Sequence, residues 1–148
     1  ERAAPRRPGS FRMTPMRTAI GLLLQHPALA ERLAADHPVL DSGVPGAALL
    51  ADLRHRIAAD PGINTGRLIE AYRDTSEQKH LERLAAHTFP TDEETERDAA
   101  LAREFDDALG RIVEQGRRAR RSQLWEAARE RALTADEKAE LRRLMNAG

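Results

Sequence analysis

The sequence predicts an all-α fold, and three observations lead to that prediction. No segment alternates apolar and polar residues in the way that a half-buried strand does. The 148 residues include only five aromatic side chains, so the core has to be built from leucine, isoleucine and alanine, which suits packed helices better than a β-sandwich. The stretch 92–131 contains no proline and only two glycines, and its apolar residues recur at helical spacing.

The stretch 92–131 is predicted to form one long helix that begins at a capping box of Thr91 and Glu94. Residues 90–110 hold eight acids and two arginines, whereas residues 111–131 hold seven arginines and three acids, which is the polarity that a helix macrodipole favours. About forty helical residues span roughly 60 Å, twice the diameter of a small domain. We therefore expect the start of this helix to pack on the preceding residues and its end to project. A break at Gly110 or Gly116 is the alternative.

The N-terminal part of the chain predicts a tail and two helices. Residues 1–13 carry four arginines, two prolines and a glycine without periodicity, which indicates a flexible linker tail. A helix is expected to follow, because Thr14 can cap it and Pro15 suits its first position. Its apolar face consists of Met16, Ile20, Leu23 and Leu24. Pro27 ends this helix and can open a short second helix that reaches Leu33.

Three more helices are expected before the long one. Residues 37–45 contain two prolines and a glycine and are predicted to be a loop. A clear amphipathic helix follows over 46–59, with Leu49, Leu50, Leu53 and Ile57 on its apolar face. A short helix over about 65–73 is expected to bury Leu68, Ile69 and Tyr72. Thr75 and Gln78 resemble a second capping box, which opens a helix that buries Leu81, Leu84 and Ala85.

The end of the chain predicts a helical hairpin. Thr134 and Glu137 form a third capping box, and the last helix is expected over 135–146 with Leu141, Leu144 and Met145 apolar. The expected organisation is therefore a tail over 1–13, a helical bundle subdomain over 14–110 that includes the start of the long helix, and a part over 111–148. This last part comprises the projecting end of the long helix and the C-terminal hairpin.

The residues that enzymes and metal proteins use are missing from this sequence. There is no cysteine, and none of the five histidines stands four residues from another, so no zinc site and no nucleophilic thiol is expected. The acids of 92–107 lack the glycine and the ligand alternation of a calcium loop. No phosphate loop, nucleophile elbow or dinucleotide fingerprint occurs. The sequence therefore predicts no catalytic residue, no metal site and no cofactor site in this chain.

Charge and hydropathy limit the remaining functions. The formal net charge is zero, which argues against a general polyanion binder. No apolar run has the length of a membrane span and no signal-peptide pattern opens the sequence, so the cytoplasm is the expected compartment. Glu1 is an unusual first residue, so we expect a piece of a longer protein.

Two features of the projecting end are candidate contact surfaces. Residues 116–121, GRRARR, could contact nucleic acid, but arginines so spaced on a helix point in several directions, and a solvated or protein-contacting face is the preferred interpretation. Trp125 lies where little core exists to bury it, and an isolated hairpin cannot hide both of its apolar stripes. Incompletely buried apolar residues beside arginines are typical of a protein-binding surface. Packing of Trp125 on Leu141 and Leu144 within the hairpin is the alternative.

Four segments of the sequence resemble a known family. They are TPMRTAIGLLLQHPALAERL at 14–33, PGINTGRLIEAYRDT at 61–75, REFDDAL at 103–109 and LTADEKAEL at 133–141. In order and spacing they are similar to the C-terminal helicase-binding domain of bacterial, DnaG-type DNA primase, and the resemblance covers residues 14–146. The resemblance implies a non-catalytic module with a helical bundle, a long helix and a C-terminal hairpin.

The resemblance also implies a partner. The hairpin would attach to the N-terminal domains of the hexameric, DnaB-type replicative helicase, the bundle would help to stimulate that helicase, and the primase would thereby be recruited to the replication fork for RNA primer synthesis. The contact residues carried over by position are Trp125, Arg129, Leu133, Leu141, Arg142, Leu144, Met145 and Asn146. The parent protein would be a DNA-dependent RNA polymerase whose zinc and magnesium belong to domains outside this chain. The chain has no cysteine for a zinc ribbon and no Glu-Gly or Asp-x-Asp pair for the metals.

The sequence also allows two alternative functions. A helical nucleic-acid-binding domain would rest on the arginine run and on the arginine-rich tail, although nucleic-acid contact is expected to be weak or indirect. The N-terminal helical domain of the helicase itself is the second. No membrane partner is expected. A monomer is expected, with a hairpin-swapped dimer as the alternative, because the hairpin makes few contacts with its own bundle.

Overall fold

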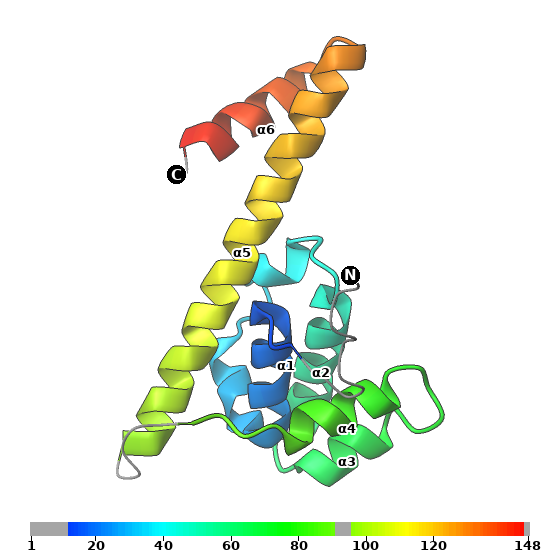
Figure 1. Cartoon of the computed structure of the whole chain (residues 1–148), viewed down its shortest axis with the longest axis vertical. Coiled ribbons are helices and arrows are strands. Elements are labelled where there is room, and N and C mark those ends of the chain that lie inside the picture. The colour runs from blue at the N-terminus through cyan, green and yellow to red at the C-terminus, as the bar shows by residue number, and fades with distance from the viewer. Residues whose placement is uncertain (1–11, 91–95, 147–148) are drawn as a thin grey trace, which may run out of the picture.

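A computed structural model gives the structure of the protein and describes residues 12–90 and 96–146. Within these ranges all regular structure is helical, which confirms the all-α fold class. The elements in chain order are α1 (Pro15–Gln25), η1 (Pro27–Arg32), η2 (Pro38–Asp41), α2 (Ala47–Ala59), α3 (Thr65–Glu70), α4 (Gln78–Ala86), α5 (Arg97–Glu130) and α6 (Ala135–Asn146), where η denotes a 3-10 helix. Figure 1 shows a compact bundle of the shorter helices on one half of α5, with α6 folded back on the other half.

The helix α1 begins where its sequence predicts. The Thr14 hydroxyl oxygen accepts a hydrogen bond from the Arg17 N–H at 3.1 Å, and Pro15 occupies the first helical position. The next segment differs in type, because η1 over 27–32 is a 3-10 helix.

The predicted loop over 37–45 contains the short helix η2. Pro38 starts it, and the His37 Nδ1 atom accepts a hydrogen bond from the Val39 N–H at 3.1 Å. Burial of Val39 ties this turn to the core. The loop prediction was therefore wrong for residues 38–41, because a proline that interrupts an α-helix can also begin a 3-10 turn.

The predicted capping box before α4 was also wrong. The Thr75 hydroxyl donates to the carbonyl of Tyr72, and the Gln78 side-chain oxygen accepts from the Asp74 N–H, so both groups stabilise the turn that precedes the helix. Asp74 has a φ of 62°, a left-handed conformation that this turn requires. The helix α4 then begins at Gln78, one residue after Glu77.

The long helix α5 is continuous through Gly110 and Gly116, so the predicted break does not occur. Its described part begins at Arg97, where Glu96 provides no side-chain cap. The predicted start at Asp92, the capping box of Thr91 and Glu94, and residues 1–11 of the predicted tail lie outside the described residues.

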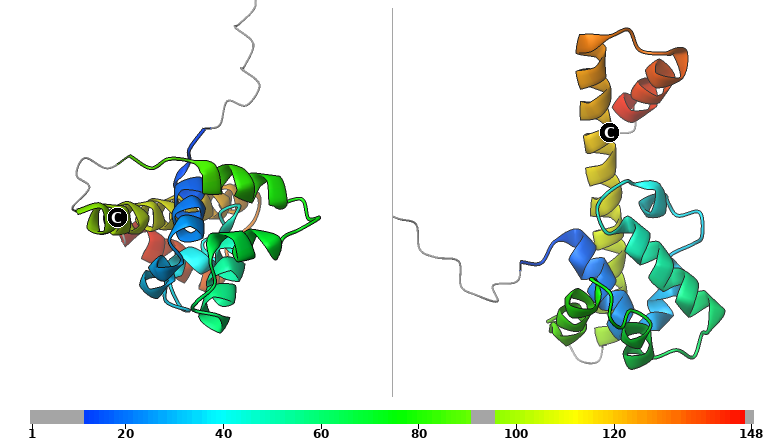
Figure 2. Two further views of the ribbon diagram at one scale, coloured as in Figure 1. Left: turned by 90° about the horizontal axis from the view of Figure 1, so that it is seen from below. Right: turned by 90° about the vertical axis from the view of Figure 1, so that its right-hand side faces the viewer.

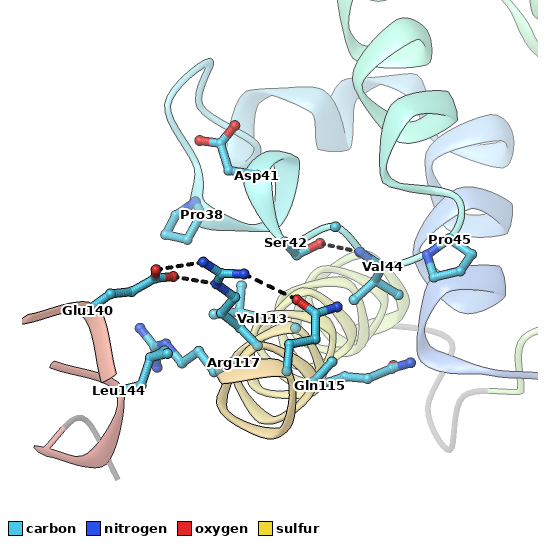
Figure 3. Close-up of a pocket in the computed structure, with 15 residues that line it drawn as sticks. Pro38, Asp41, Ser42, Val44, Pro45, Val113, Gln115, Arg117, Glu140 and Leu144 are labelled. Carbon is cyan, nitrogen blue, oxygen red and sulfur yellow. Dashed lines mark hydrogen bonds and ion pairs between the residues drawn. The ribbon is translucent and has the colours of Figure 1, made fainter. Parts of the chain in front are cut away.

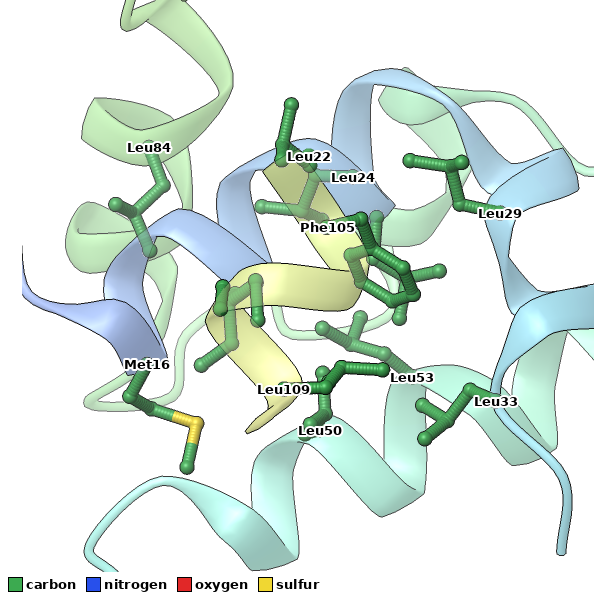
Figure 4. Close-up of a cluster of buried hydrophobic side chains, with 14 of the residues drawn as sticks. Met16, Leu22, Leu24, Leu29, Leu33, Leu50, Leu53, Leu84, Phe105 and Leu109 are labelled. Atoms are coloured by element: carbon green, nitrogen blue, oxygen red, sulfur yellow. The ribbon is translucent and has the colours of Figure 1, made fainter. Parts of the chain in front are cut away.

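The core of the bundle is built mainly from leucine, as predicted. Figure 4 shows Phe105 and Leu109 of α5 inserted among leucines of α1, η1 and α2. The helix α1 lies at the centre, between α5 and α4, and Figure 2 shows the other helices of the bundle arranged around it. The largest fully buried side chains are Phe105, Ile20, Leu22, Leu23, Leu24, Leu33, Leu50, Leu53, Leu68, Leu81, Leu84 and Leu109. Three residues predicted to face the core, Leu49, Ile69 and Ala85, are only half-buried at its edge.

Contact between α5 and the bundle reaches as far as Gly116. A Cβ atom at Gly116 would lie 2.6 Å from the carbonyl oxygen of Ser42, so the segment after η2 rests directly on the backbone of α5. The next buried residue along α5 is Leu124, which is not part of the main core. Beyond Gly116 the helix therefore leaves the bundle and contacts α6.

Candidate functional site

The projecting hairpin, which we define as residues 117–146, is held together by a small apolar contact. Leu124 of α5 and Leu141 of α6 are 1% and 8% exposed and lie outside the main core. Leu133, in the connection between the helices, and Leu144 are half-buried. Two buried leucines are a small core, so polar contacts contribute more to the position of α6 than they do within the bundle.

Two ion pairs clamp α6 onto α5. The Arg120 guanidinium donates to both carboxylate oxygens of Glu140, at 2.8 and 2.9 Å. The Arg131 guanidinium does the same to Glu137, at 2.8 Å for each bond. Such two-pronged pairs fix the orientation of both side chains. Arg120 lowers the pKa of Glu140, and Arg131 together with the Thr134 N–H lowers the pKa of Glu137 to about 2.

The turn between the two helices carries the predicted capping box. The Thr134 N–H donates to the Glu137 carboxylate at 2.8 Å, and the Glu137 N–H donates to the Thr134 hydroxyl oxygen at 3.1 Å. This prediction is confirmed, as are the bounds 135–146 of the last helix. Glu137 thus contacts both the turn and Arg131, and together with the Arg120–Glu140 pair it holds α6 against α5.

A cleft of about 470 Å³ separates the hairpin from the bundle. In Figure 3 the loop that carries Pro38 and Ser42 faces Glu140 and Leu144 across α5. The cleft is open and has both polar and apolar walls, and the Arg120–Glu140 pair lies on its hairpin side. The bundle and α6 each pack on α5, on opposite sides of this cleft.

Trp125 and Met145 are the two large apolar side chains that are exposed among the described residues, at 52% and 56%. Trp125, Ala128 and Ala132 continue the helical spacing of apolar residues in the sequence, but they do not form a buried stripe. Leu124 is the residue of that turn that becomes buried, and Ala128 and Ala132 are exposed. At 52% exposure, Trp125 is not buried within the hairpin either. The exposed tryptophan points instead to a surface that a partner covers.

The eight predicted contact residues fall into two groups. The exposed members are Trp125, Arg129, Arg142, Met145 and Asn146, and the buried or half-buried members are Leu133, Leu141 and Leu144. The Arg129 side chain is 77% exposed and lies 3.7 Å from Glu126, a loose surface pair. Because Leu141 is buried in the closed hairpin, its side chain holds α6 in place and offers no surface to a partner.

Sequence reasoning missed the two clamps and misjudged half of the arginine run. Arg120 is engaged by Glu140, and Arg121 donates to the Leu144 carbonyl at 3.3 Å and lies 3.8 Å from Glu114. Of the four arginines of the run, two therefore serve the hairpin. No local signal reveals this, because Arg120 and Glu140 are twenty residues apart and meet only when the turn closes.

Two further observations concern the described residues, 12–90 and 96–146. No group of three or more His, Cys, Asp or Glu side chains among them is placed to hold a metal ion. None of their helices is long and apolar enough to cross a membrane.

Comparison with known proteins gives consistent matches. The family model described as DNA primase DnaG DnaB-binding matches residues 16–144. The DNA primase of Salmonella typhimurium is 30% identical over 131 residues, which are 88% of this chain and 22% of that protein. The DNA primase of Pasteurella multocida is 42% identical over 79 residues, or 53% of this chain and 14% of that protein. The chain thus spans only about a seventh to a fifth of these relatives.

A solved structure, the DnaG primase C-terminal domain from Vibrio cholerae, is similar to the whole arrangement. Its TM-score is 0.71 at 31% identity, and the alignment covers 92% of this chain and 95% of that one. These matches do not favour a nucleic-acid-binding domain or an N-terminal domain of the helicase. Because the matched residues run from α1 into α6, the chain belongs to the DnaB-binding domain family of DnaG-type DNA primase.

Proposed function

We propose that this chain is the non-catalytic module that attaches a bacterial DNA primase to its DnaB-type replicative helicase. The observation that carries the proposal is the projecting hairpin, which leaves Trp125 and Met145 exposed in a member of the DnaB-binding family. The partner surface is the N-terminal domains of the helicase hexamer, and the chain acts as a monomer in the cytoplasm, at the replication fork. Exchange of hairpins between two copies is the alternative assembly.

The mechanism is tethering. Residues 1–13 link this module to the rest of the primase, whose RNA-polymerising domains hold the zinc and magnesium. Binding of the hairpin to the helicase keeps those domains near the single-stranded template, which raises their effective concentration without changing their chemistry. In this proposal the bundle, over 14–110, stimulates the helicase, and the part over 111–148 attaches the chain to it.

Two properties of the hairpin support an attachment role. Tryptophan is enriched among the few residues that dominate interface energies, and Trp125 is the single tryptophan of the chain. The clamps at Glu137 and Glu140 fix the angle of α6 before any partner arrives. A preformed surface loses less conformational entropy on binding than a mobile one does.

The proposal is tested by calorimetric titration of the chain into the DnaB-type helicase of the same organism. Saturable binding is expected, and Trp125→Ala is expected to weaken it by about thirtyfold, which corresponds to roughly 2 kcal/mol. Arg103→Ala is the matched control, because Arg103 is also exposed on α5 but lies beside the bundle. Absence of binding by the unmodified chain, or equal weakening by both variants, would contradict the proposal.

A further inference from the structure

The outer face of α6 is basic and ends in an exposed methionine. Lys138, Arg142 and Met145 stand at intervals of four and three residues, so they share one face of the helix, and all three are exposed. This exposed stripe runs beside the buried Leu141, which packs on α5, because Leu141 stands three residues after Lys138 and four before Met145. Neither Lys138 nor Arg142 makes an ion pair with any described residue.

The outer face of α5 repeats the same pattern around Trp125. Arg118, Trp125 and Arg129 are separated by seven and four residues and therefore lie along one stripe. All three are exposed, and the one ion pair of this stripe is the loose contact of Arg129 with Glu126. Each helix of the hairpin thus presents two cations and one large apolar side chain along its outer face.

Two of the five carboxylates of the hairpin are engaged in its internal clamps. Glu137 and Glu140 neutralise Arg131 and Arg120 within the hairpin, and these contacts lower the pKa of both carboxyls, which therefore stay ionised. Acids that serve internal clamps cannot offset the cations of the outer faces. The remaining side chains of residues 117–146 are seven Lys/Arg and three Asp/Glu, so the surplus of four positive charges lies outside the clamps.

Charge is also divided between the two parts of the chain. Residues 117–146 carry nine Lys/Arg and five Asp/Glu, a surplus of four positive charges. Residues 12–116 carry twelve Lys/Arg and eighteen Asp/Glu, a surplus of six negative charges. A zero net charge therefore conceals an acidic bundle and a basic hairpin. Such an asymmetry orients a molecule as it approaches a charged surface.

We infer that the outer faces of the hairpin bind an acidic protein surface, with Trp125 and Met145 as apolar anchors between the cations. This rests on the proposed function, in which the partner is the DnaB-type helicase, and it adds the chemistry of the docking surface: carboxylates around apolar pockets. Repulsion of the acidic bundle from the same surface brings the hairpin into contact first. A protein partner fits better than a nucleic acid, because an extended polyanion would be repelled by the bundle and each stripe offers only two cations.

The test is the association rate of the 148-residue chain with the helicase at about 50 mM and about 300 mM salt. The rate constant of association is expected to fall about tenfold at the higher salt, because screening weakens steering by charge. The double variant Arg118→Glu with Arg142→Glu is expected to lower it about tenfold at low salt and to flatten its salt dependence. Arg103→Glu reverses one charge on α5 beside the bundle, half of the change in the double variant, and is expected to change the rate less than twofold.

The outcomes separate this inference from the proposed function. Helicase binding that is insensitive to salt and unaffected by the double variant overturns the acidic docking surface and leaves the attachment role intact. No binding by the unmodified chain overturns the attachment role itself. Competition between a single-stranded oligonucleotide and the helicase for the unmodified chain, lost in the double variant, would show that the stripes bind nucleic acid and would also overturn the inference.

Discussion

Replacing Gly116 by alanine is expected to destabilise the protein, whereas the same change at Gly110 is expected to stabilise it. Both glycines lie inside α5, where alanine is favoured over glycine by about 1 kcal/mol. Their surroundings differ. A Cβ atom at Gly110 would meet nothing within 4 Å, but one at Gly116 would lie 2.6 Å from the Ser42 carbonyl oxygen and 3.2 Å from its Cα atom.

The size of the Gly116 effect follows from this contact. The clash is with backbone, so the segment after η2 has to move away from α5, and overpacking of this kind costs about 1–3 kcal/mol. Subtracting the gain of about 1 kcal/mol in helix propensity leaves a net loss of up to about 2 kcal/mol. For a domain of this size the melting temperature is expected to fall by up to roughly 8 °C for Gly116→Ala and to rise by roughly 2–4 °C for Gly110→Ala.

Thermal and urea unfolding, followed by far-ultraviolet circular dichroism, measure both variants beside the unmodified chain. Gly110→Ala is the matched control, because it makes the same chemical change in the same helix without the contact. If Gly116→Ala were as stabilising as Gly110→Ala, the close approach of Ser42 to α5 would be refuted. The conclusion that α5 contacts the bundle as far as Gly116 would then be wrong as well.

Three further predictions concern the clamps and the core. The pKa of Glu137 is lowered from 4.5 to about 2, so its protonation is expected to loosen the hairpin as the pH falls from about 4.5 toward 2. The loosening is followed by Trp125 fluorescence, and the Glu137→Gln variant is expected not to show this pH-dependent change. Leu124→Ala, at a 1% exposed site, is expected to cost about 2 kcal/mol and to speed amide exchange in α6 but not in the bundle. Tyr72→Phe removes the hydroxyl that donates to Asp52 and is expected to cost about 1 kcal/mol in urea unfolding.

Each of these predictions has a contrary outcome. If Trp125 fluorescence changed with pH in the same way in the unmodified chain and in Glu137→Gln, the Arg131–Glu137 pair would not be what holds the hairpin closed. Faster exchange throughout the chain in the leucine variant would mean that hairpin and bundle unfold together. If Tyr72→Phe changed neither the stability of the protein nor the pKa of Asp52, the contact between the Tyr72 hydroxyl and Asp52 would contribute nothing to the free energy of unfolding.

Local signals predicted the helices whose ends are fixed by neighbouring residues. Thr14 with Pro15, and Thr134 with Glu137, place the starts of α1 and α6 correctly, because a capping contact joins groups only three residues apart. The same reasoning failed at Thr75, where the hydroxyl and amide stabilise a turn that precedes the helix. A capping pattern identifies groups that can form local hydrogen bonds, but more than one local backbone geometry allows those bonds to form.

The surface of the hairpin was harder to predict than its helices. Spacing alone cannot decide whether Leu124 or Trp125 faces inward, because α5 packs on the bundle in its first part and on α6 in its last, and the buried stripe shifts between them. The clamp of Arg120 on Glu140 depends on closure of the turn and has no local pattern. The resemblance to the primase domain implied that the hairpin is the contact region, but only the structure separates its exposed residues from those that hold it together.

Hydrogen–deuterium exchange of the chain, alone and bound to the DnaB-type helicase, tests the central claim most directly. The hairpin rests on a small apolar contact, so its amides are expected to exchange faster than those of the bundle core in the free chain. On binding, the strongest slowing is expected over residues 117–146. Slowing concentrated in α1 to α4, with an unchanged hairpin, would contradict the assignment of helicase attachment to this end of the molecule.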